Sequence, residues 1–372
     1  LSTADFRRAC RAYAERFIDA MTQQFKRLGI FGDWSAPYLT MNFRYQASIV
    51  RALGRFVERG LVYKGKKPVH WCVHCRTALA EAEVEYEDHT SPSIYVEFPL
   101  AEASADELAS RMPGLAGRPV SVLIWTTTPW TIPSNLAVAF HPELDYAAYD
   151  VDGRAVIVAE ELAATVAGVA GRVFGEPLAR AKGAAFEHVR FRHPLYARDS
   201  LGVLGDYVTL DAGTGAVHTA PGHGADDFNT GVKYGLEIYA PIGPSGHFHD
   251  TVELVGGLQV FEANAKVEDA LHERARLWHR QSFSHQYPHC WRCHNPVIFL
   301  ATSQWFIRMD GEPVIRHPAE PEGAARTLRA AALDAIDHHV RWVPAWGHDR
   351  IYNMIANRPD WCISRQRAWG GP

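Results

Sequence analysis

The chain has 372 residues, of which 47% are apolar and 22% charged, and its formal net charge is −4. This composition predicts a soluble globular protein of two or three domains in the cytoplasm, and it argues against a disordered chain. No apolar run reaches the ~18 residues of a membrane span, so we expect no membrane partner, and a nucleic acid would have to meet local Lys and Arg patches.

Residues 2–28 are predicted to form an amphipathic helix, because apolar side chains recur at three- and four-residue steps and Gly29 follows them. Ser2 and Asp5 have the spacing of a capping box at its start. A second helix of the same kind is predicted over residues 42–59. Both apolar faces are more typical of core scaffolding than of a binding site.

Four of the six cysteines form two Cys-x-x-Cys pairs, Cys72 with Cys75 and Cys290 with Cys293. In a long chain without secretory features this spacing favours a metal over disulfides, and two such pairs predict one structural, tetrahedral zinc site. The alternative is that each pair is a reduced dithiol. Four flanking histidines could compete as ligands: His70, His74, His289 and His294. The wide gap between the pairs indicates a module inserted between two halves of the site.

From about residue 84 to residue 280 the pattern changes to short apolar runs separated by Gly, Pro and Asp-Gly turns. Residues 146–151 and 154–158, joined by Asp152-Gly153, are typical of a β-hairpin. Further strands are expected at 93–98, 203–210 and 216–219, and helices at 226–234 and 261–277. We therefore predict a compact α+β module with a barrel-like centre.

After the second cysteine pair, residues 296–307 are predicted to form a strand, and residues 323–338 and 345–357 are predicted to form helices. The chain then reaches an Arg- and Trp-rich segment over residues 360–370. Two interpretations of this segment stay open: a solvated loop edge, or a surface for phosphate or nucleic acid.

Two stretches that are far apart in the sequence carry the candidate chemistry. In residues 125–135 a buried-looking strand delivers three consecutive threonines into a Pro-rich turn. Residues 213–228 open with glycines, run through an apolar segment to His218, and place Asp227 at the predicted start of a helix. Hydroxyls, an imidazole and a carboxylate in an apolar frame are the usual make-up of a small-ligand site, so we expect the stretches to converge.

Each of these residues also has a plainer interpretation when it is taken alone. Consecutive threonines often reflect β-propensity, and a single His218 is more often a satisfied core histidine. Asp226 or Asp227 could cap the helix that they begin, and His223, between two glycines, could be a turn residue with a solvated ring. Only the joint pattern favours a functional site.

Six segments resemble the class I isoleucyl-tRNA synthetases, and the resemblance covers essentially the whole chain. They are residues 32–41, 78–86, 125–135, 213–228, 303–307 and 360–370. The related enzymes for valine and leucine read like Thr-Thr-Arg-Pro-Glu-Thr where this chain has Thr-Thr-Thr-Pro-Trp-Thr, and this difference favours isoleucine.

The resemblance implies a fold of α/β and α+β parts. Residues 1–90 and 286–372, each with one zinc knuckle, would belong to a Rossmann-type catalytic domain, interrupted by a β-barrel-like editing domain over residues 91–285. The family's His-Ile-Gly-His-type and Lys-Met-Ser-Lys-Ser-type motifs are missing, and the chain starts at Leu1 rather than Met. We therefore expect a fragment that does not activate isoleucine by itself, with ATP and Mg implied for the full-length enzyme only.

The activity that the resemblance implies for this chain is proofreading within an isoleucine–tRNA ligase. A pocket that accepts isoleucine cannot strongly reject valine, because one methylene is worth only about 1–3 kcal/mol. A second site would hydrolyse the ester of valyl-tRNA(Ile), and correct placement of water against an activated ester can supply most of the catalysis. The expected partners are tRNA(Ile) and the aminoacyl esters of valine and isoleucine, with the chain acting as a monomer.

The resemblance also assigns roles by position. Asp227 would bind the α-ammonium of the amino acid by a charge-assisted hydrogen bond, and His218 would form the wall that excludes the extra methyl of isoleucine. Thr127, Thr128 and Thr131 would line the pocket and hydrogen-bond the ester, the ribose and the attacking water. The other expected substrate-binding residues are Trp125, Thr126, Asn135 and His223. Trp125 and Asn135 would hold the terminal adenosine.

Two other classes of function stay open. The run Gly-His-Gly-x-Asp-Asp beside threonine hydroxyls is compatible with a metal-dependent hydrolase that uses His218, His223 and Asp227 as ligands. A zinc-stabilised tRNA-binding module without chemistry is the other alternative. Deacylation that persists in a chelator would exclude a catalytic metal, and tRNA binding without turnover would indicate the binding module.

Overall fold

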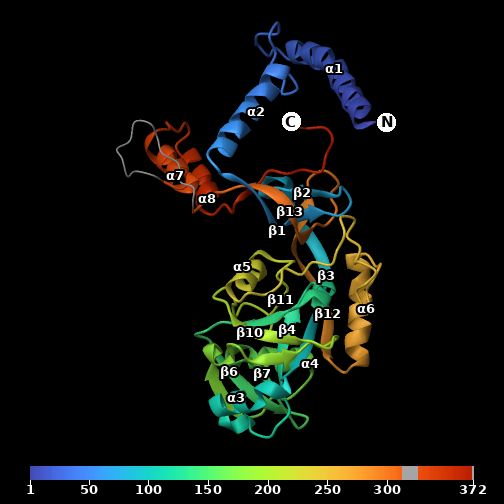
Figure 1. Cartoon of the computed structure of the whole chain (residues 1–372), viewed down its shortest axis with the longest axis vertical. Coiled ribbons are helices and arrows are strands. Elements are labelled where there is room, and N and C mark those ends of the chain that lie inside the picture. The colour runs from blue at the N-terminus through green and yellow to red at the C-terminus, as the bar shows by residue number, and fades with distance from the viewer. Residues whose placement is uncertain (312–325, 371–372) are drawn as a thin grey trace. The chain divides into compact units, whose positions relative to one another are not determined.

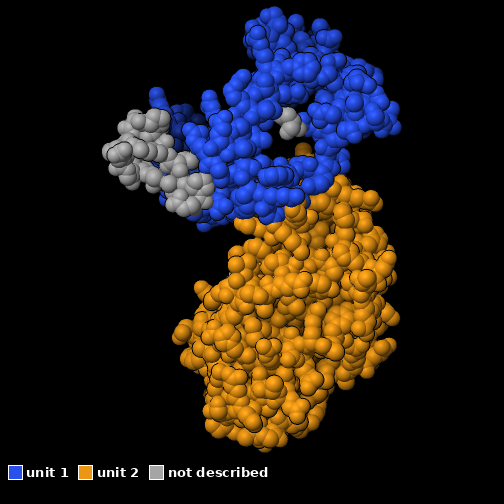
Figure 2. Space-filling view, in the orientation of Figure 1, with its two compact units in different colours: residues 1–65, 304–372 blue, residues 66–303 orange. Residues whose placement is uncertain are grey.

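The computed structural model describes residues 1–311 and 326–370 and contains two compact units (Figures 1 and 2). Unit 1 comprises Leu1–Gly65 and Gln304–Pro372, and unit 2 comprises Lys66–Ser303. The strands β1 (Val62–Cys72) and β13 (Ile298–Ile307) carry the chain from one unit to the other. Both cysteine pairs and both polar stretches therefore belong to unit 2.

Unit 2 is built on two sheets of mixed direction, with the strand orders β12-β3-β4-β7-β6-β8 and β11-β5-β10-β9. The strands of the larger sheet are β3 (Val84–Pro99), β4 (Val120–Thr126), β6 (Asp145–Val151), β7 (Arg154–Ala159), β8 (Ala179–Lys182) and β12 (Leu277–Cys290). Those of the smaller sheet are β5 (Ala137–Phe140), β9 (Arg190–Arg192), β10 (Asp199–Leu204) and β11 (Ala216–Thr219). The fold is thus mixed α/β.

The barrel-like centre predicted from the sequence is wrong. Each of these sheets ends in two edge strands, and the part of the chain that the structure describes closes no barrel. The pairs β4–β7 and β5–β10 are parallel, and a parallel pair needs a crossover rather than a tight turn. In the described chain the edge strands β12 and β8, and likewise β11 and β9, do not pair with each other, so both sheets stay open. The sequence pattern located strands, but not which strands pair.

The hairpin of β6 and β7 confirms the prediction for this segment. The two strands pair in antiparallel register from Tyr146 opposite Ala159 to Val151 opposite Arg154. At the turn, Asp152 has a φ of 53° and the following glycine a φ of 82°. Positive φ at both central residues defines the type I′ turn that two-residue hairpins favour, so local turn chemistry fixes this register.

The core of unit 2 fixes where β11 begins. The buried rings of Phe140 and Phe186 stack with centroids 4.6 Å apart, and Tyr146 lies edge-on to both. The Tyr146 hydroxyl donates to the carbonyl of Gly215 over 2.5 Å. A Cβ at Gly215 would lie 2.3 Å from the Cβ of Ala159, and its φ is +75°. Only glycine allows this close approach, which sets the start of the strand that carries His218.

Unit 1 begins with the two predicted helices, α1 (Thr3–Arg27) and α2 (Phe43–Glu58). The predicted cap of α1 is confirmed, because the Asp5 amide donates to Ser2 Oγ over 3.2 Å. Neither helix buries a single residue among those described, so core scaffolding is the wrong interpretation of their apolar faces here. The reason is that residues 32–41 cover these faces only in part, through ring contacts such as Tyr38 with Tyr45 and Trp34 with Phe25. Phe17, for example, is 42% exposed.

A third sheet has the strand order β14-β13-β1-β2 and includes β2 (Thr77–Leu79) and β14 (Trp361–Cys362). The other helices are α3 (Ala105–Arg111), α4 (Ala163–Ala170), α5 (Ala225–Lys233), α6 (Val260–Glu273), α7 (Leu328–His338) and α8 (Gly347–Ala356). The first residues of the predicted helix 323–338, numbers 323–325, lie outside the described residues. No helix that the structure describes has the length and apolarity to cross a membrane.

Two predicted elements end earlier than expected. The strand predicted over 203–210 stops at Leu204, because the next residues form a turn in which the Val208 amide bonds the Gly205 carbonyl over 3.3 Å. The helix predicted to reach residue 277 stops at Glu273, because Ala275 takes a φ of 53° and β12 begins at Leu277.

Candidate functional site

The two polar stretches converge in unit 2. Thr131 Oγ1, from the first stretch, lies 2.9 Å from Nε2 of His218 in the second. Thr131 belongs to η4 (Pro129–Ser134), a 3-10 turn whose six residues are all buried. His218 lies on β11, opposite Val138 of β5. Both side chains are therefore held by ordered elements.

A chain of hydrogen bonds fixes the tautomer of His218. The Asn135 amide nitrogen donates to the Ala137 carbonyl over 2.8 Å, so its oxygen is the atom that accepts from Ser200 Oγ at 2.5 Å. The same amide nitrogen lies 3.4 Å from His218 Nδ1, which must accept. Nε2 then carries the hydrogen and donates to Thr131. Burial lowers the pKa of His218 to about 4, and nearby His223 adds to the effect, so the ring is neutral at pH 7.

Three threonine hydroxyls form a short row beside this histidine. Thr128 Oγ1 lies 3.2 Å from the hydroxyls of both Thr126 and Thr131. Thr131 Oγ1 also donates to the Thr128 carbonyl over 2.8 Å. Thr127 is half-buried and makes no side-chain hydrogen bond within residues 1–311 and 326–370, so its hydroxyl is uncommitted. We call Thr126, Thr128, Thr131, Asn135 and His218 the threonine–histidine cluster.

A second buried histidine, which the sequence analysis missed, supports the turn that carries Thr131. His193 Nδ1 accepts the amides of Leu195 and Tyr196 at 3.0 and 3.1 Å, so Nε2 donates to the Ile132 carbonyl at 2.9 Å. Burial lowers the pKa of His193 to about 3. Its partners are all backbone groups, and no sequence motif around it signals this role.

Asp227 is anchored next to His218 through the backbone. Its Oδ2 accepts the amide of Ala220, two residues after His218, over 2.7 Å. The N-cap of α5 is Gly224, without a side-chain cap bond, so Asp227 lies in the first turn of the helix rather than at its N-cap. A Cβ at Gly224 would lie 2.9 Å from Asp227 Cγ, so a larger residue there would displace this carboxylate. Burial, followed by the like charge of Asp226, raises the pKa of Asp227 to about 7.

His223 is buried rather than solvated, which corrects the turn interpretation. Its Nδ1 donates to the Phe299 carbonyl over 3.1 Å, and its Nε2 therefore accepts from Ser134 Oγ over 3.1 Å. The ring packs edge-on against Trp130 with centroids 5.1 Å apart. Burial lowers the pKa of His223 to about 4. His223 thus holds the end of the turn that carries Thr131.

Trp125 is the predicted site residue that the structure separates from the cluster. Successive side chains of a strand point to opposite faces, and in β4 it is Thr126 that joins the row of hydroxyls. Trp125 Nε1 instead donates to Ser93 Oγ over 2.6 Å, and its ring meets Phe283 edge-on at 5.5 Å. Gly213 packs against this indole, because a Cβ there would lie 3.1 Å from Trp125 Cβ.

The metallohydrolase alternative does not match the positions of its proposed ligands. The groups of potential metal ligands found in the described chain do not include His218, His223 and Asp227. Both ring nitrogens of each histidine are already engaged in contacts within the protein. These three residues therefore do not form a ligand set.

The four cysteines of the two pairs do form such a set. Their Sγ atoms all lie within 4.8 Å of one another, and the Sγ atoms of Cys72 and Cys293 are 3.5 Å apart. Thiolates at tetrahedral zinc lie about 3.8 Å apart, given Zn–S bonds of about 2.3 Å. The flanking histidines are not members of the group. We call these four residues the cysteine cluster.

Both cysteine pairs have the same local backbone. The residue after the second cysteine has a positive φ in each, 52° at Arg76 and 51° at His294. In the first pair the Cys75 amide donates to Cys72 Sγ over 3.3 Å. Cys72 and Cys290 are fully buried. Two matching turns that aim thiols at one point fit a metal ion better than two unrelated dithiols.

The comparison with known families decides what kind of chain this is. The family model for tRNA synthetases class I (I, L, M and V) matches residues 1–372. The chain belongs to the class I tRNA synthetases. It is 51% identical over 366 residues to the isoleucine–tRNA ligase of Geobacter sulfurreducens, covering 98% of this chain and 38% of that protein. It is 49% identical over 372 residues to the isoleucine–tRNA ligase of Syntrophotalea carbinolica, covering 100% of this chain and 38% of that protein.

This class I chain thus spans about 38% of the length of the curated relatives that it matches. Solved structures give weaker likenesses. The leucyl-tRNA synthetase editing domain of P. knowlesi aligns with a TM-score of 0.40 and 11% identity over 53% of this chain and 96% of that one. The corresponding domain of P. falciparum aligns with a TM-score of 0.39 and 10% identity over 50% of this chain and 99% of that one.

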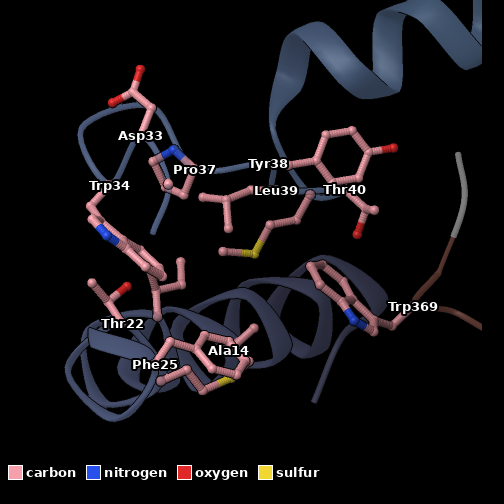
Figure 3. A pocket seen from close by; sticks show the side chains of 14 residues that line it. Ala14, Thr22, Phe25, Asp33, Trp34, Pro37, Tyr38, Leu39, Thr40 and Trp369 are labelled. Atoms are coloured by element: carbon pink, nitrogen blue, oxygen red, sulfur yellow. The ribbon is translucent and has the colours of Figure 1, made fainter. Parts of the chain in front are cut away.

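Unit 1 of this class I chain contains a separate groove of about 540 Å³ (Figure 3). Its walls are side chains of α1, residues of the 32–41 segment, and Trp369 from the Arg- and Trp-rich end. Arg7 of α1 donates to the Ala368 carbonyl over 2.6 Å and lies 5.8 Å from the Trp369 ring. In the same segment, Arg365 donates to the carbonyls of Cys362 and Ser364. Arg365 therefore serves internal contacts, which weakens the interpretation of this segment as a phosphate surface.

Proposed function

We propose that this chain carries the editing site of an isoleucine–tRNA ligase and hydrolyses the ester of valyl-tRNA(Ile). The observation that carries the proposal is the 2.9 Å contact between Thr131 and His218, because it joins the two remote stretches into one polar cluster. Membership of class I and the names of the relatives support isoleucine as the amino acid. The proposed partners are tRNA(Ile) and the aminoacyl esters of valine and isoleucine.

Asp227 is the proposed anchor for the substrate's α-ammonium group. Backbone amides, Ala220 foremost, are the donors to its carboxylate, no cation among the described residues pairs with it, and burial raises its pKa to about 7, so the ionised form lacks a positive partner. An ammonium group would supply the missing positive charge and lower this pKa again. Anchoring the ammonium near β11 would bring the amino-acid side chain toward His218.

His218 is the proposed wall of the side-chain pocket. The ring cannot rotate without losing the contacts of both nitrogens, at 3.4 Å to Asn135 and 2.9 Å to Thr131. A ring held at both nitrogens is a rigid surface, and rigidity is what size exclusion requires. The wall would admit valine and reject the additional methylene of isoleucine.

The threonine row is proposed to place the ester and the attacking water. Thr127 has an uncommitted hydroxyl and Thr128 is half-buried, so these two can face a ligand. Water adds to the ester carbonyl carbon, the bond from that carbon to the ribose oxygen breaks, and that oxygen takes a proton. A neighbouring ribose hydroxyl of the substrate can relay the proton, so no protein nucleophile is needed.

The cysteine cluster is the proposed holder of a structural zinc ion. Four thiolates close the coordination shell, so zinc would supply folding energy and no open position for catalysis. Burial raises the pKa of the Cys72 thiol, and a bound cation would reverse that effect. Zinc would tie together the regions where the inserted module begins and ends.

The domain limits and whole-enzyme activity complete the proposal. Residues 91–285 are proposed as the editing domain, and residues 1–90 and 286–372 as parts of a Rossmann-type catalytic domain. Attachment of isoleucine to tRNA with ATP and Mg is proposed for the longer protein. Trp125 and Asn135 are proposed to help hold the terminal adenosine, Trp125 from the far face of β4, and His223 is proposed to support substrate binding by holding the turn that carries Thr131.

The decisive experiment is deacylation of valyl-tRNA(Ile) and isoleucyl-tRNA(Ile) by this polypeptide alone. We expect release of valine well above the spontaneous rate and slow release of isoleucine. Equal release of both amino acids would contradict the size-exclusion role. Binding of tRNA without release of either would support the non-catalytic module instead.

A further inference from the structure

Four arginines follow one side of α2 and its C-cap. They are Arg44, Arg51, Arg55 and Arg59, and all four are exposed. At 3.6 residues per turn, their spacing places them within a sector of about 80° along about 22 Å of helix. We call this set the basic stripe.

The arginines of the basic stripe have no stabilising partner within the described part of the protein. Within the described residues, none of its guanidinium groups makes a hydrogen bond or ion pair, and Glu58 is the single acidic residue of α2. Several other arginines of unit 1 are engaged, although Arg16 and Arg27 of α1 also lack a side-chain partner among the described residues. Arg11, for example, donates to the Met41 carbonyl over 2.7 Å and lies 4.4 Å from the Phe43 ring. Four unpaired cations stand out on a chain whose net charge is −4.

The apolar side of α2 faces another way. Tyr45, Leu53 and Phe56 are half-buried and lie about 85–165° around the helix from the centre of the stripe. The Tyr45 ring packs edge-on against Tyr38 with centroids 5.4 Å apart. An anionic membrane would have to take up this apolar side as well as the arginines, whereas a polyanion such as RNA needs the arginines alone.

We propose that the basic stripe of α2 binds the phosphate backbone of an RNA. The inference rests on the proposed function, which names tRNA as the partner. Arginine presents a planar fork of donors that matches phosphate oxygens, and a row of such forks suits a polyanion. Contacts of this kind position an RNA and read no sequence, so the stripe serves affinity and orientation rather than choice of amino acid.

The test measures binding of an uncharged tRNA(Ile) transcript to the whole chain by fluorescence anisotropy at several KCl concentrations. The variant is R51Q/R55Q/R59Q. Each phosphate contact contributes about 0.7–0.9 to the slope of log K against log salt, so three lost contacts should reduce the slope by about 2–3. Affinity at 100 mM salt, relative to binding extrapolated to 1 M, should fall about 100–1,000-fold. Circular dichroism checks that α2 stays helical, and the single variant R55E should weaken binding in the same direction.

The matched control is R8Q/R16Q/R27Q, which removes three arginines from α1 of the same unit. It changes net charge equally and should leave most of the slope intact. A stripe variant with the wild-type slope, or a control that loses as much, overturns the proposal. Hydrolysis of a valyl ester of adenosine, which lacks the tRNA backbone, is measured in parallel. Failure of the wild type there sinks the editing function, whereas stripe-dependent binding would still stand.

Discussion

Unit 2 brings remote residues together at two places and in two different ways. In the threonine–histidine cluster, neutral donors and acceptors pair from Ser200 through Asn135 and His218 to Thr131. In the cysteine cluster, four sulfurs lie within 4.8 Å of one another, and the donors to them include the Cys75 amide and Asn295. The first arrangement is satisfied by the protein alone, while the second calls for a cation. Damage to the first should change chemistry, and damage to the second should change attachment and stability.

The largest effect should come from Asp227→Ala. A charge-assisted hydrogen bond contributes about 1.5–3 kcal/mol, so kcat/KM for valyl-tRNA(Ile) should fall about 10–150-fold without unfolding. Single-turnover deacylation measures this. Asp226→Ala is the matched control, because its side chain is exposed and should have little effect. Equal rates for both variants would remove Asp227 from the site.

The next effect concerns discrimination rather than rate. His218→Ala removes the proposed wall, so isoleucyl-tRNA(Ile) should become a substrate. One methylene is worth about 10–200-fold in a hydrophobic pocket, and the valine-to-isoleucine rate ratio should shrink by that order. The measurement is competitive deacylation of the two esters. An unchanged ratio would show that another group excludes isoleucine.

The pH dependence of kcat/KM should follow the ionisation of the Asp227 carboxyl group. Its pKa is raised to about 7 and the ionised form binds the ammonium, so kcat/KM should fall about tenfold per pH unit below about 7. His218 and His223 cannot produce this limb, because their pKa values are lowered to about 4. The raised pKa also means that this group's contribution to the free energy of unfolding falls as pH rises from about 4 to about 7. A rate that stays flat from pH 8 to pH 5 would contradict the ammonium role.

A smaller effect is expected at Ser200, which touches no proposed substrate atom. Ser200→Ala removes the hydroxyl that orients Asn135, and loss of one neutral hydrogen bond should lower kcat about 2–10-fold. Nitrogen-15 NMR of His218 should show loss of the pure Nε2–H tautomer, which a purely structural defect would not cause. Ser200→Thr should restore both the rate and the tautomer.

Loss of the cysteine cluster should leave ester hydrolysis unchanged. Cys72→Ser combined with Cys290→Ser should release about one zinc per chain and lower the thermal transition of unit 2, while a valyl ester of adenosine is still cleaved. Elemental analysis and calorimetry measure these changes. Cys10→Ser is the control, because this thiol lies on α1 outside the cluster. Purified wild-type chain without metal would contradict the zinc assignment.

The sequence predicted best what local rules determine. The capped start of α1 and the Asp152-Gly153 hairpin depend on neighbouring residues only, and both are confirmed. The grouping of four thiols follows from spacing that few other functions require. Convergence of the two polar stretches was expected from their chemistry, and the Thr131–His218 contact shows it.

What the sequence did not predict depends on long-range pairing. The open, mixed sheets follow from parallel pairs that no local pattern reveals. Which face of β4 Trp125 projects from depends on where this strand ends, and it ends at the next residue, Thr126. His193 and Ser200 act through partners 61 and 65 residues away, so no motif marks them. The exposed faces of α1 and α2 depend on what covers them, which periodicity does not contain.

The two cysteine pairs lie far apart in the sequence, and this distance has a consequence for synthesis of the chain. Cys72 and Cys75 leave the ribosome on the order of tens of seconds before Cys290 and Cys293, given typical elongation rates. During that interval the first two thiols have no partners from the second pair, while the intervening module can already fold as a unit. Folding of the module shortens the effective loop and lowers the entropic cost of closing the site. Metal binding would then be the last step of maturation, because it requires that both ends of the insertion have been synthesised.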